Sequence, residues 1–462
     1  MRLRYILLGL GLILVAVCAG FLILAWHPEI ERIARPDPAG FDQPLVQRGA
    51  QLAAVGNCIA CHTVPGGQSF AGGLPLPTPF GTIYSTNITP DEETGIGSWS
   101  EESFIRSMRQ GVHRDGRHLY PVFPYDHFTR VSDEDNRALY AYLMTRPPVR
   151  ATLPENELRF PFNIRVAIAG WKLLYFEEGP FEPDPGQDEA WSRGAYLAEG
   201  LGHCGSCHTR RNALGALDAD HHYGGGEAEG WTAYAINRES PAPVPWEVDD
   251  LAFYLRHGWH QLHGVSRGPM AEVTGNLAGL PDQDITAIAR YVKSVMGEPG
   301  AERRARAEEL RAAFAPVDDA KVAAADSQAS PETPVQGRGA AIYAAACASC
   351  HDGARPQPFG GLPLSLSTAV NAPNPQNIVN VTLFGLPPAD GEASSVMPAF
   401  GSVLSDEEMV ALLEHMRERF TNAPAWSGLP ELVRRTRTGE HYVRVLPTDG
   451  IERSPANVGA RD

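Results

Sequence analysis

Six of the seven cysteines in this 462-residue chain fall into three copies of one pattern, Cys-x-x-Cys-His. The copies occupy 58–62, 204–208 and 347–351, and their first cysteines lie 146 and 143 residues apart. This even spacing indicates a unit that is repeated three times. The remaining cysteine, Cys18, lies in the apolar N-terminus, so no pair is left for a disulfide framework.

The chemistry that needs this pattern is covalent haem attachment. Two thiols three residues apart on one helical turn can reach the two vinyl groups of a haem, and the adjacent histidine then ligates the iron. A thioredoxin-like dithiol needs no such histidine, and structural zinc requires paired Cys-x-x-Cys units at short spacing. We therefore expect three haem c groups, attached by Cys58, Cys61, Cys204, Cys207, Cys347 and Cys350 and ligated by His62, His208 and His351.

Similar sequences surround each pattern. An Arg-Gly pair opens an apolar-periodic helix before it, at Arg48-Gly49, Arg193-Gly194 and Arg338-Gly339. A helix with a Ser or Pro start and an acidic first turn follows it, at 132–143, 281–292 and 405–416. The repeat predicts a mostly α chain of three tandem class I-like cytochrome c domains.

The predicted domains span 42–149, 190–297 and 334–422. Pro-rich connectors, a helix at about 299–314 and a flexible linker at 323–334 separate them. Residues 423–462 read as an irregular polar tail.

The sixth iron ligand decides what such a haem does, because a His/Met pair raises the potential and closes the iron to small molecules. Met397, in Val-Met-Pro just before the last helix, is the candidate in the third unit. Met270, in Gly-Pro-Met, is the candidate in the second. The alternative for each is a methionine that packs under a loop.

The first unit breaks this pattern, because Phe123 stands where the third unit has Met397. Met108 is the candidate replacement ligand, since the second unit has Leu255 at the equivalent position. A histidine or an open iron remain as alternatives, and Met144 is expected to pack in the core. The histidines that could ligate are His113, His118 and His127.

The N-terminus reads as a membrane segment at 1–27. Arg2 and Arg4 precede 22 residues without a formal charge, from Tyr5 to Trp26. A helix of that length reaches about 33 Å, enough to cross the hydrocarbon core, and longer than the apolar part of most signal peptides. We expect an uncleaved anchor in the cytoplasmic membrane with the haem domains in the periplasm, a removed signal peptide being the alternative.

Charge and the remaining motifs narrow the partners. The net charge of −16 argues against nucleic acid, whose phosphates need clustered Lys and Arg. Asn87, Asn237 and Asn377 recur after an extended loop, where an amide could bind a haem propionate or stitch the loop. His257, His260 and His263 are expected at a solvated helix end, with a surface metal site as the alternative.

Two further motifs carry a family resemblance: Phe80-Gly-Thr-Ile-Tyr-Ser-Thr-Asn-Ile-Thr-Pro90 and Leu119-Tyr-Pro-Val-Phe-Pro-Tyr-Asp-His-Phe128. With the three pentads they make the chain similar, from Phe41 to about Phe420, to the three-haem, membrane-anchored cytochrome c subunits of bacterial periplasmic dehydrogenases. These include the subunits of alcohol, gluconate and aldehyde dehydrogenases. Phe123 followed by Asp126-His127-Phe128 most resembles the subunits paired with molybdenum hydroxylases such as nicotinate dehydrogenase.

The resemblance implies an electron-transfer subunit without a substrate site of its own. A separate periplasmic dehydrogenase would donate electrons, and ubiquinone or a terminal oxidase would accept them beside the membrane lipid. A quinoprotein or flavoprotein dehydrogenase is the alternative partner. The rival from another class is a self-contained haem enzyme that works at an open first haem, with His127 or His113 as its acid/base group.

Overall fold

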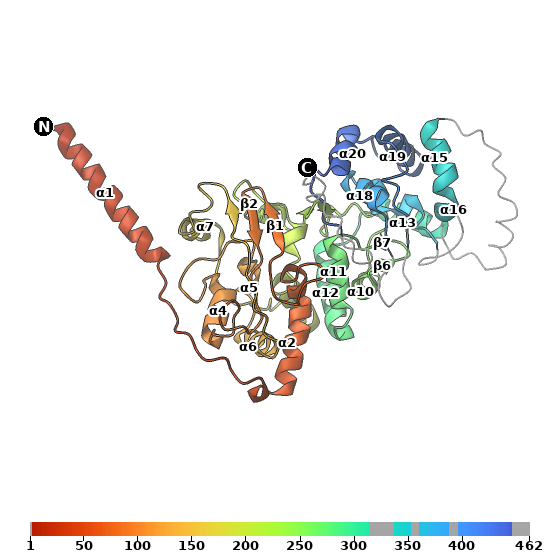
Figure 1. Ribbon diagram of the computed structural model, residues 1–462. Helices are drawn as coiled ribbons and strands as arrows, with labels where there is room; N and C mark the ends of the chain where they lie inside the picture. Colours follow the sequence, from red (N-terminus) through yellow and green to blue (C-terminus); the bar gives the residue numbers. More distant parts are fainter. Residues whose placement is uncertain (1, 314–336, 353–359, 388–395, 446–462) are drawn as a thin grey trace. The chain divides into compact units, whose positions relative to one another are not determined.

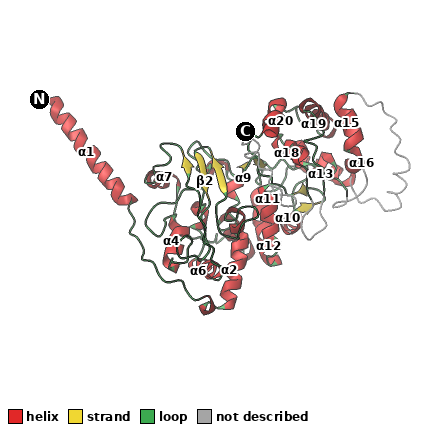
Figure 2. Ribbon diagram, viewed as in Figure 1, coloured by secondary structure: helices red, strands yellow, loops and turns green. Residues whose placement is uncertain are grey.

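The computed structural model describes residues 2–313, 337–352, 360–387 and 396–445. Helices dominate these residues and the strands are short (Figure 2). The chain divides into two compact units, the first formed by residues 1–185 with 199–203 and the second by 186–198 with 204–462. The predicted linker at 323–334 lies outside the described residues.

The first unit contains helices and one small sheet (Figure 1). Its helices are α1 (Arg2–Ala25), α2 (Gln43–Val55), α3 (Cys58–Cys61), α4 (Glu101–Gln110), α5 (Tyr125–Phe128), α6 (Asp133–Met144) and α7 (Ala167–Tyr175). Strands β1 (Pro75–Thr78), β2 (Gly81–Tyr84) and β3 (Glu157–Leu158) form an antiparallel sheet in that order. The register pairs Leu76 with Ile83 and Thr82 with Glu157.

Helix α8 (Glu189–Glu199) leads into the second unit. The other helices are α9 (Gly205–His208), α10 (Val248–His257), α11 (Pro269–Leu277), α12 (Asp282–Met296), α13 (Ala301–Ala313), α15 (Arg338–Ala346), α16 (Ala348–His351), α17 (Thr368–Asn371), α18 (Gln376–Phe384), α19 (Asp406–Phe420) and α20 (Leu429–Thr438). Two hairpins pair β4 (Gly226–Ala228) with β5 (Trp231–Ala233) and β6 (Trp259–His260) with β7 (Gly264–Val265). The predicted helix at 299–314 is thus confirmed as α13.

One helix crossing occurs three times and explains the Arg-Gly pairs. The glycine of α2, α8 and α15 lies so close to α6, α12 and α19 that a Cβ would come within about 2 Å of a backbone oxygen. These oxygens belong to Ala138, Ala287 and Ala411, which face Gly49, Gly194 and Gly339. The closing helix therefore packs directly against the backbone of the opening helix in each repeat.

The arginine before each glycine holds the same crossing from its edge. Its guanidinium pairs with a carboxylate in the acidic first turn of the closing helix. The pairs are Arg48–Asp135 at 2.6 Å, Arg193–Asp284 at 2.9 Å and Arg338–Glu408 at 2.8 Å. The acidic helix start therefore contributes both a capping charge and a partner for the repeat's arginine.

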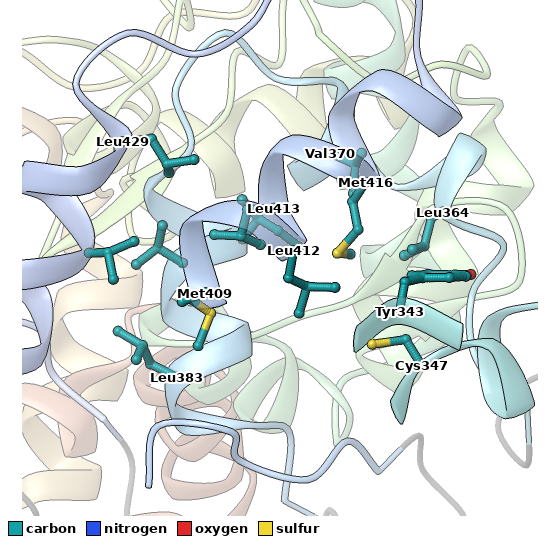
Figure 3. Close-up of a cluster of buried hydrophobic side chains, with 13 residues drawn as sticks. Tyr343, Cys347, Leu364, Val370, Leu383, Met409, Leu412, Leu413, Met416 and Leu429 are labelled. Atoms are coloured by element: carbon teal, nitrogen blue, oxygen red, sulfur yellow. The ribbon is translucent and has the colours of Figure 1, made fainter. Parts of the chain in front are cut away.

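The third repeat has its own apolar core. Met409, Leu412, Leu413 and Met416 of α19 point toward side chains of α15, α17, α18 and α20 (Figure 3). Cys347 is buried in this cluster, so the first thiol of the third pentad borders the core.

The prediction of an irregular tail is wrong for residues 429–438, which form α20. Leu429 and Val433 of α20 are fully buried in the core of the third repeat. Three arginines and other polar residues cover the rest of this ten-residue helix and hide its narrow apolar stripe in the sequence.

Bonds also join the second and third repeats inside the second unit. The side chain of Asn377 on α18 accepts from Thr232 N and donates to Thr232 O of β5, and Asn380 donates to Gly230 O at 2.9 Å. The tail continues this contact, because Arg444 pairs with Glu229 and Glu272. These two repeats therefore form one compact body.

Replacing Gly194 by Ala tests the crossing. A Cβ there would lie 1.9 Å from Ala287 O and would force the two helices apart, at a cost of about 2 kcal/mol or more in the free energy of unfolding. Thermal unfolding of the haem-loaded protein measures the effect. Gly275→Ala in α11 is the matched control, since nothing lies within 4 Å of a Cβ at that helical position and alanine there should be neutral or stabilise by up to about 1 kcal/mol. Equal midpoints for both variants would contradict the crossing.

Candidate haem-binding sites

Each Cys-x-x-Cys-His pattern forms a single short helix directly after the opening helix of its repeat. These helices are α3, α9 and α16. One turn brings residues i and i+3 to the same face, so the two thiols of a pattern lie above one another. The opening helix, fixed by its glycine crossing, thus sets the position of the thiol pair.

The histidine of each pattern is held in one orientation. Its Nδ1 donates to a backbone carbonyl of the loop that follows, and the three bonds are alike. They are His62 to Thr86 O at 2.6 Å, His208 to Tyr234 O at 2.7 Å and His351 to Leu362 O at 2.8 Å. A proton on Nδ1 leaves the Nε2 lone pair available to a metal, which is how metal-ligating histidines are oriented in proteins.

Burial keeps the first two of these imidazoles in the ligating form. Desolvation lowers the pKa of His62 and of His208, opposed only in part by the backbone hydrogen bonds to Thr86 and Tyr234. A neutral imidazole is the form that binds a metal.

The thiols do not have the electrostatics of a redox dithiol. Desolvation raises the pKa of Cys58 to about 12, and that of Cys207 and Cys347 to about 11. Reactive Cys-x-x-Cys dithiols have a lowered thiol pKa. The surroundings therefore favour attachment of a cofactor over disulfide exchange.

A buried cation near Met270 gives an independent test of fit to a haem. The Nε and Nη2 atoms of Arg267 are buried without a hydrogen-bond partner among the described residues, and desolvation lowers the pKa of this guanidinium. An unpaired buried charge is costly unless a counter-ion reaches it. A haem propionate has the charge and the acceptor oxygens to satisfy it, so the residues present fit the group.

The three candidate methionines lie in different local structures. Met397 is half-buried in a loop, where its backbone N and O bond Leu386 at 2.9 and 2.8 Å. Met270 is half-buried in the first turn of α11, after Gly268 with its positive φ of 59°. Met108 is buried on α4, and Met144 is fully buried on α6, as expected for packing.

Hydrogen bonds divide the three histidine alternatives in the first unit. Both ring nitrogens of His118 are engaged, Nε2 with Ala25 O at 2.9 Å and Nδ1 with Lys172 Nζ at 3.1 Å. Those of His113 are engaged with Asp115 and Arg117. His127 bonds Glu199 O through Nδ1, and its Nε2 is buried without a partner among the described residues. His127 is thus the histidine alternative with an available nitrogen.

The repeated asparagines stitch loops. Asn87 donates to Thr94 Oγ1 and Val149 O and accepts from Thr89 N. Asn237 donates to His222 O and accepts from Glu239 N. With Asn377 bonded to β5, the amide groups serve the backbone, which supports the loop interpretation over propionate binding.

The prediction of a solvated helix end is wrong for His260 and His263. Both are buried in the β6–β7 hairpin, each 3.4 Å from the carboxylate of Asp250, and His263 stacks on Trp246 at 3.5 Å. Desolvation lowers the pKa of His263 to about 4. The sequence hid this because the hairpin strands have only two residues each. In the part of the chain that is described, no group of three or more His, Cys, Asp or Glu side chains could hold a metal ion.

The comparisons with known proteins agree with this geometry. The family model "Cytochrome c" matches residues 46–147, and the model "Cytochrome C oxidase, cbb3-type, subunit III" matches residues 335–416. Both ranges contain a helix crossing, a Cys-x-x-Cys-His helix and the bonded histidine. Cytochrome c domains carry covalently bound haem c.

The relatives cover most of the chain. It is 43% identical to one of the subunits of nicotinate dehydrogenase from Pseudomonas putida over 88% of its length, and spans 33% of that protein. It is 37% identical to the fructose dehydrogenase cytochrome subunit of Gluconobacter japonicus, over 87% of this chain and 85% of the relative. For the gluconate 2-dehydrogenase cytochrome c subunit of Pantoea cypripedii the values are 38%, 82% and 86%. The chain therefore belongs to the family of cytochrome c subunits of dehydrogenases.

Proposed function

We propose that this chain is a membrane-anchored, three-haem electron-transfer subunit. It accepts electrons from a periplasmic dehydrogenase of the molybdenum hydroxylase or aldehyde dehydrogenase type and passes them to ubiquinone or a terminal oxidase. The observation that carries the proposal is the threefold recurrence of one arrangement, in which a paired-thiol helix is followed by a histidine whose Nδ1 donates to a loop carbonyl. Haem c supplies reversible one-electron chemistry when bound.

Three cytochrome c domains, at 42–149, 190–297 and 334–422, are the arrangement that the repeat supports. The second of them has the same Gly crossing, Arg–carboxylate pair and bonded histidine as the first and third. Cys58, Cys61, Cys204, Cys207, Cys347 and Cys350 would attach the three haems.

Met270 and Met397 are the proposed sixth ligands of the second and third haems, and Met108 that of the first. Arg267 would pair with a propionate of the second haem. Each of these groups acts by holding the cofactor and setting its potential, so no substrate chemistry is assigned to this chain.

The location and partner rest on the N-terminus and on the relatives. Helix α1 is long and apolar enough to cross a membrane, a test that a signal sequence also passes. We place the haem domains in the periplasm and the anchor in the cytoplasmic membrane, since thioether attachment follows export and Arg2 and Arg4 favour the inside. The name of the Pseudomonas putida relative favours a molybdenum hydroxylase partner, and those of the other relatives keep a sugar or alcohol dehydrogenase as the alternative.

Haem stoichiometry tests the count of three. Replacing both cysteines of one pattern by serine should remove one haem and leave two, because each pattern attaches its own cofactor. A pyridine haemochrome assay per mole of protein measures the loss for the pairs Cys58/Cys61, Cys204/Cys207 and Cys347/Cys350. The Cys18→Ala variant is the control and should retain three. A pair whose loss leaves haem content unchanged would contradict the proposal.

Replacing Met397 by Ala should lower the potential of the third haem. Loss of a thioether ligand removes the stabilisation of the ferrous state, and axial ligands span about 0.8 V, so we expect a fall of about 0.1 V or more. Redox titration of the purified protein measures it. Met416→Leu is the control in the same repeat, since Met416 is 3% exposed in the apolar core and should not change any potential. An unaltered potential in Met397→Ala would remove this residue as a ligand.

Ligand exchange separates the electron-transfer subunit from a self-contained haem enzyme. The unmodified protein should show three low-spin haems whose spectra do not change with carbon monoxide or cyanide. Met108→Leu should open the first haem to carbon monoxide, whereas Met144→Leu should not. Should Met108→Leu leave the spectrum unchanged and His127→Leu alter it, His127 is the ligand. A carbon monoxide complex in the unmodified protein would favour the enzyme.

A further inference from the structure

The segment Phe160–Tyr175 presents apolar side chains to solvent on the first unit. Phe160 is 79% exposed, Leu173 67% and Leu174 70%, and Phe162, Ile164 and Val166 are each exposed by 40% or more. A contiguous apolar surface of this kind marks an interaction site. We propose that this segment docks on the lipid surface of the outer leaflet beside α1, which rests on the proposed anchoring role of α1.

Helix α7 lies against the end of the membrane-spanning helix. A Cβ on Gly170 would lie 3.6 Å from the ring of Phe21, four residues before α1 ends at Ala25. Four residues of helix rise about 6 Å, so α7 meets α1 at the level where α1 leaves the hydrocarbon. The chain after α1 is fixed on the same unit, because His118 Nε2 bonds Ala25 O at 2.9 Å and Arg106 donates to Pro28 O at 2.7 Å.

One face of α7 is held by the protein and the other is bare. Ala169 is buried, and Lys172 Nζ donates to Gln110 O and Gly111 O at 2.5 and 2.8 Å. Val166 and Leu173 are seven residues apart, two turns along one face, and Gly170 lies between them. The exposed apolar face is therefore the face that meets Phe21.

Charge favours lipid as the occupant of this face. The basic residues between 160 and 175 are Arg165 and Lys172, and both turn inward. Arg165 donates to His118 O at 2.9 Å and lies over the ring of Tyr120, as Lys172 lies over the ring of Tyr125. No acidic residue occurs between 160 and 175. An uncharged apolar face continuous with a membrane-spanning helix suits the acyl chains at a bilayer surface.

Site-specific photocrosslinking in native membranes tests the occupant. The photoreactive amino acid p-benzoylphenylalanine is placed at Leu174 of the full, haem-loaded chain and, separately, at Phe160. Lipid adducts should form at both positions, several-fold more than from Leu214, an exposed control in the second unit. Adducts to another protein, or no adduct above the Leu214 level, would overturn the proposal.

A probe at Leu14 of α1 separates failure of docking from failure of the anchor. Lipid adducts at Leu14 without adducts at 160 and 174 would overturn docking and leave the anchor intact. Loss of residues 1–25 from the mature chain would instead refute the anchor. The pair Leu173→Glu and Leu174→Glu should reduce the lipid adduct from the Phe160 probe several-fold while haem content stays the same. An undiminished adduct would also overturn the proposal.

Discussion

The hydrogen bond from each pattern's histidine Nδ1 to a loop carbonyl is the interaction on which the haem sites depend. It joins two parts of a repeat that the sequence separates by 24, 26 and 11 residues. It fixes the tautomer of the imidazole, and with it the nitrogen that can bind iron. The loop carbonyl is a backbone atom, so it leaves no mark in the sequence, and the loops can differ in composition while making the same bond.

The helix crossing gives that bond a fixed frame. A glycine in the opening helix brings the closing helix to van der Waals contact with its backbone, and the preceding arginine binds the acidic first turn of the closing helix. Both partners of the crossing stand out in the sequence, because Arg-Gly and an acidic helix start are local signals. This is why the helix pairs and the thiol helices could be predicted.

Other features depend on contacts between distant residues and were not predictable. Helix α20 is amphipathic only because Leu429 and Val433 meet α19, and its arginines dominate its composition. The burial of His260 and His263 depends on Asp250 and Trp246 of neighbouring segments. Helix α7 is apolar enough to be noticed, yet a short apolar run does not reveal which of its faces is bare.

The second and third repeats share bonds that make them one body, and the repeat alone did not predict this. Asn377 was expected to serve its own loop or a propionate, yet its amide bonds Thr232 in the preceding repeat. Asn380 and Arg444 reach the same hairpin, at Gly230 and Glu229. A fixed geometry between two cofactor-binding repeats suits electron transfer, because the distance between redox groups then does not fluctuate.

The hydrogen bonds around the first haem site also weigh against an enzyme there. Such an enzyme needs an open iron and an acid/base group beside it. His113 has both ring nitrogens engaged, and desolvation lowers its pKa to about 4. His127 keeps one available nitrogen, so it can be the ligand or the acid/base group but not both. With Met108 as ligand the iron is closed, and with His127 as ligand the catalytic group is lost; an enzyme therefore requires that both residues stay off the iron.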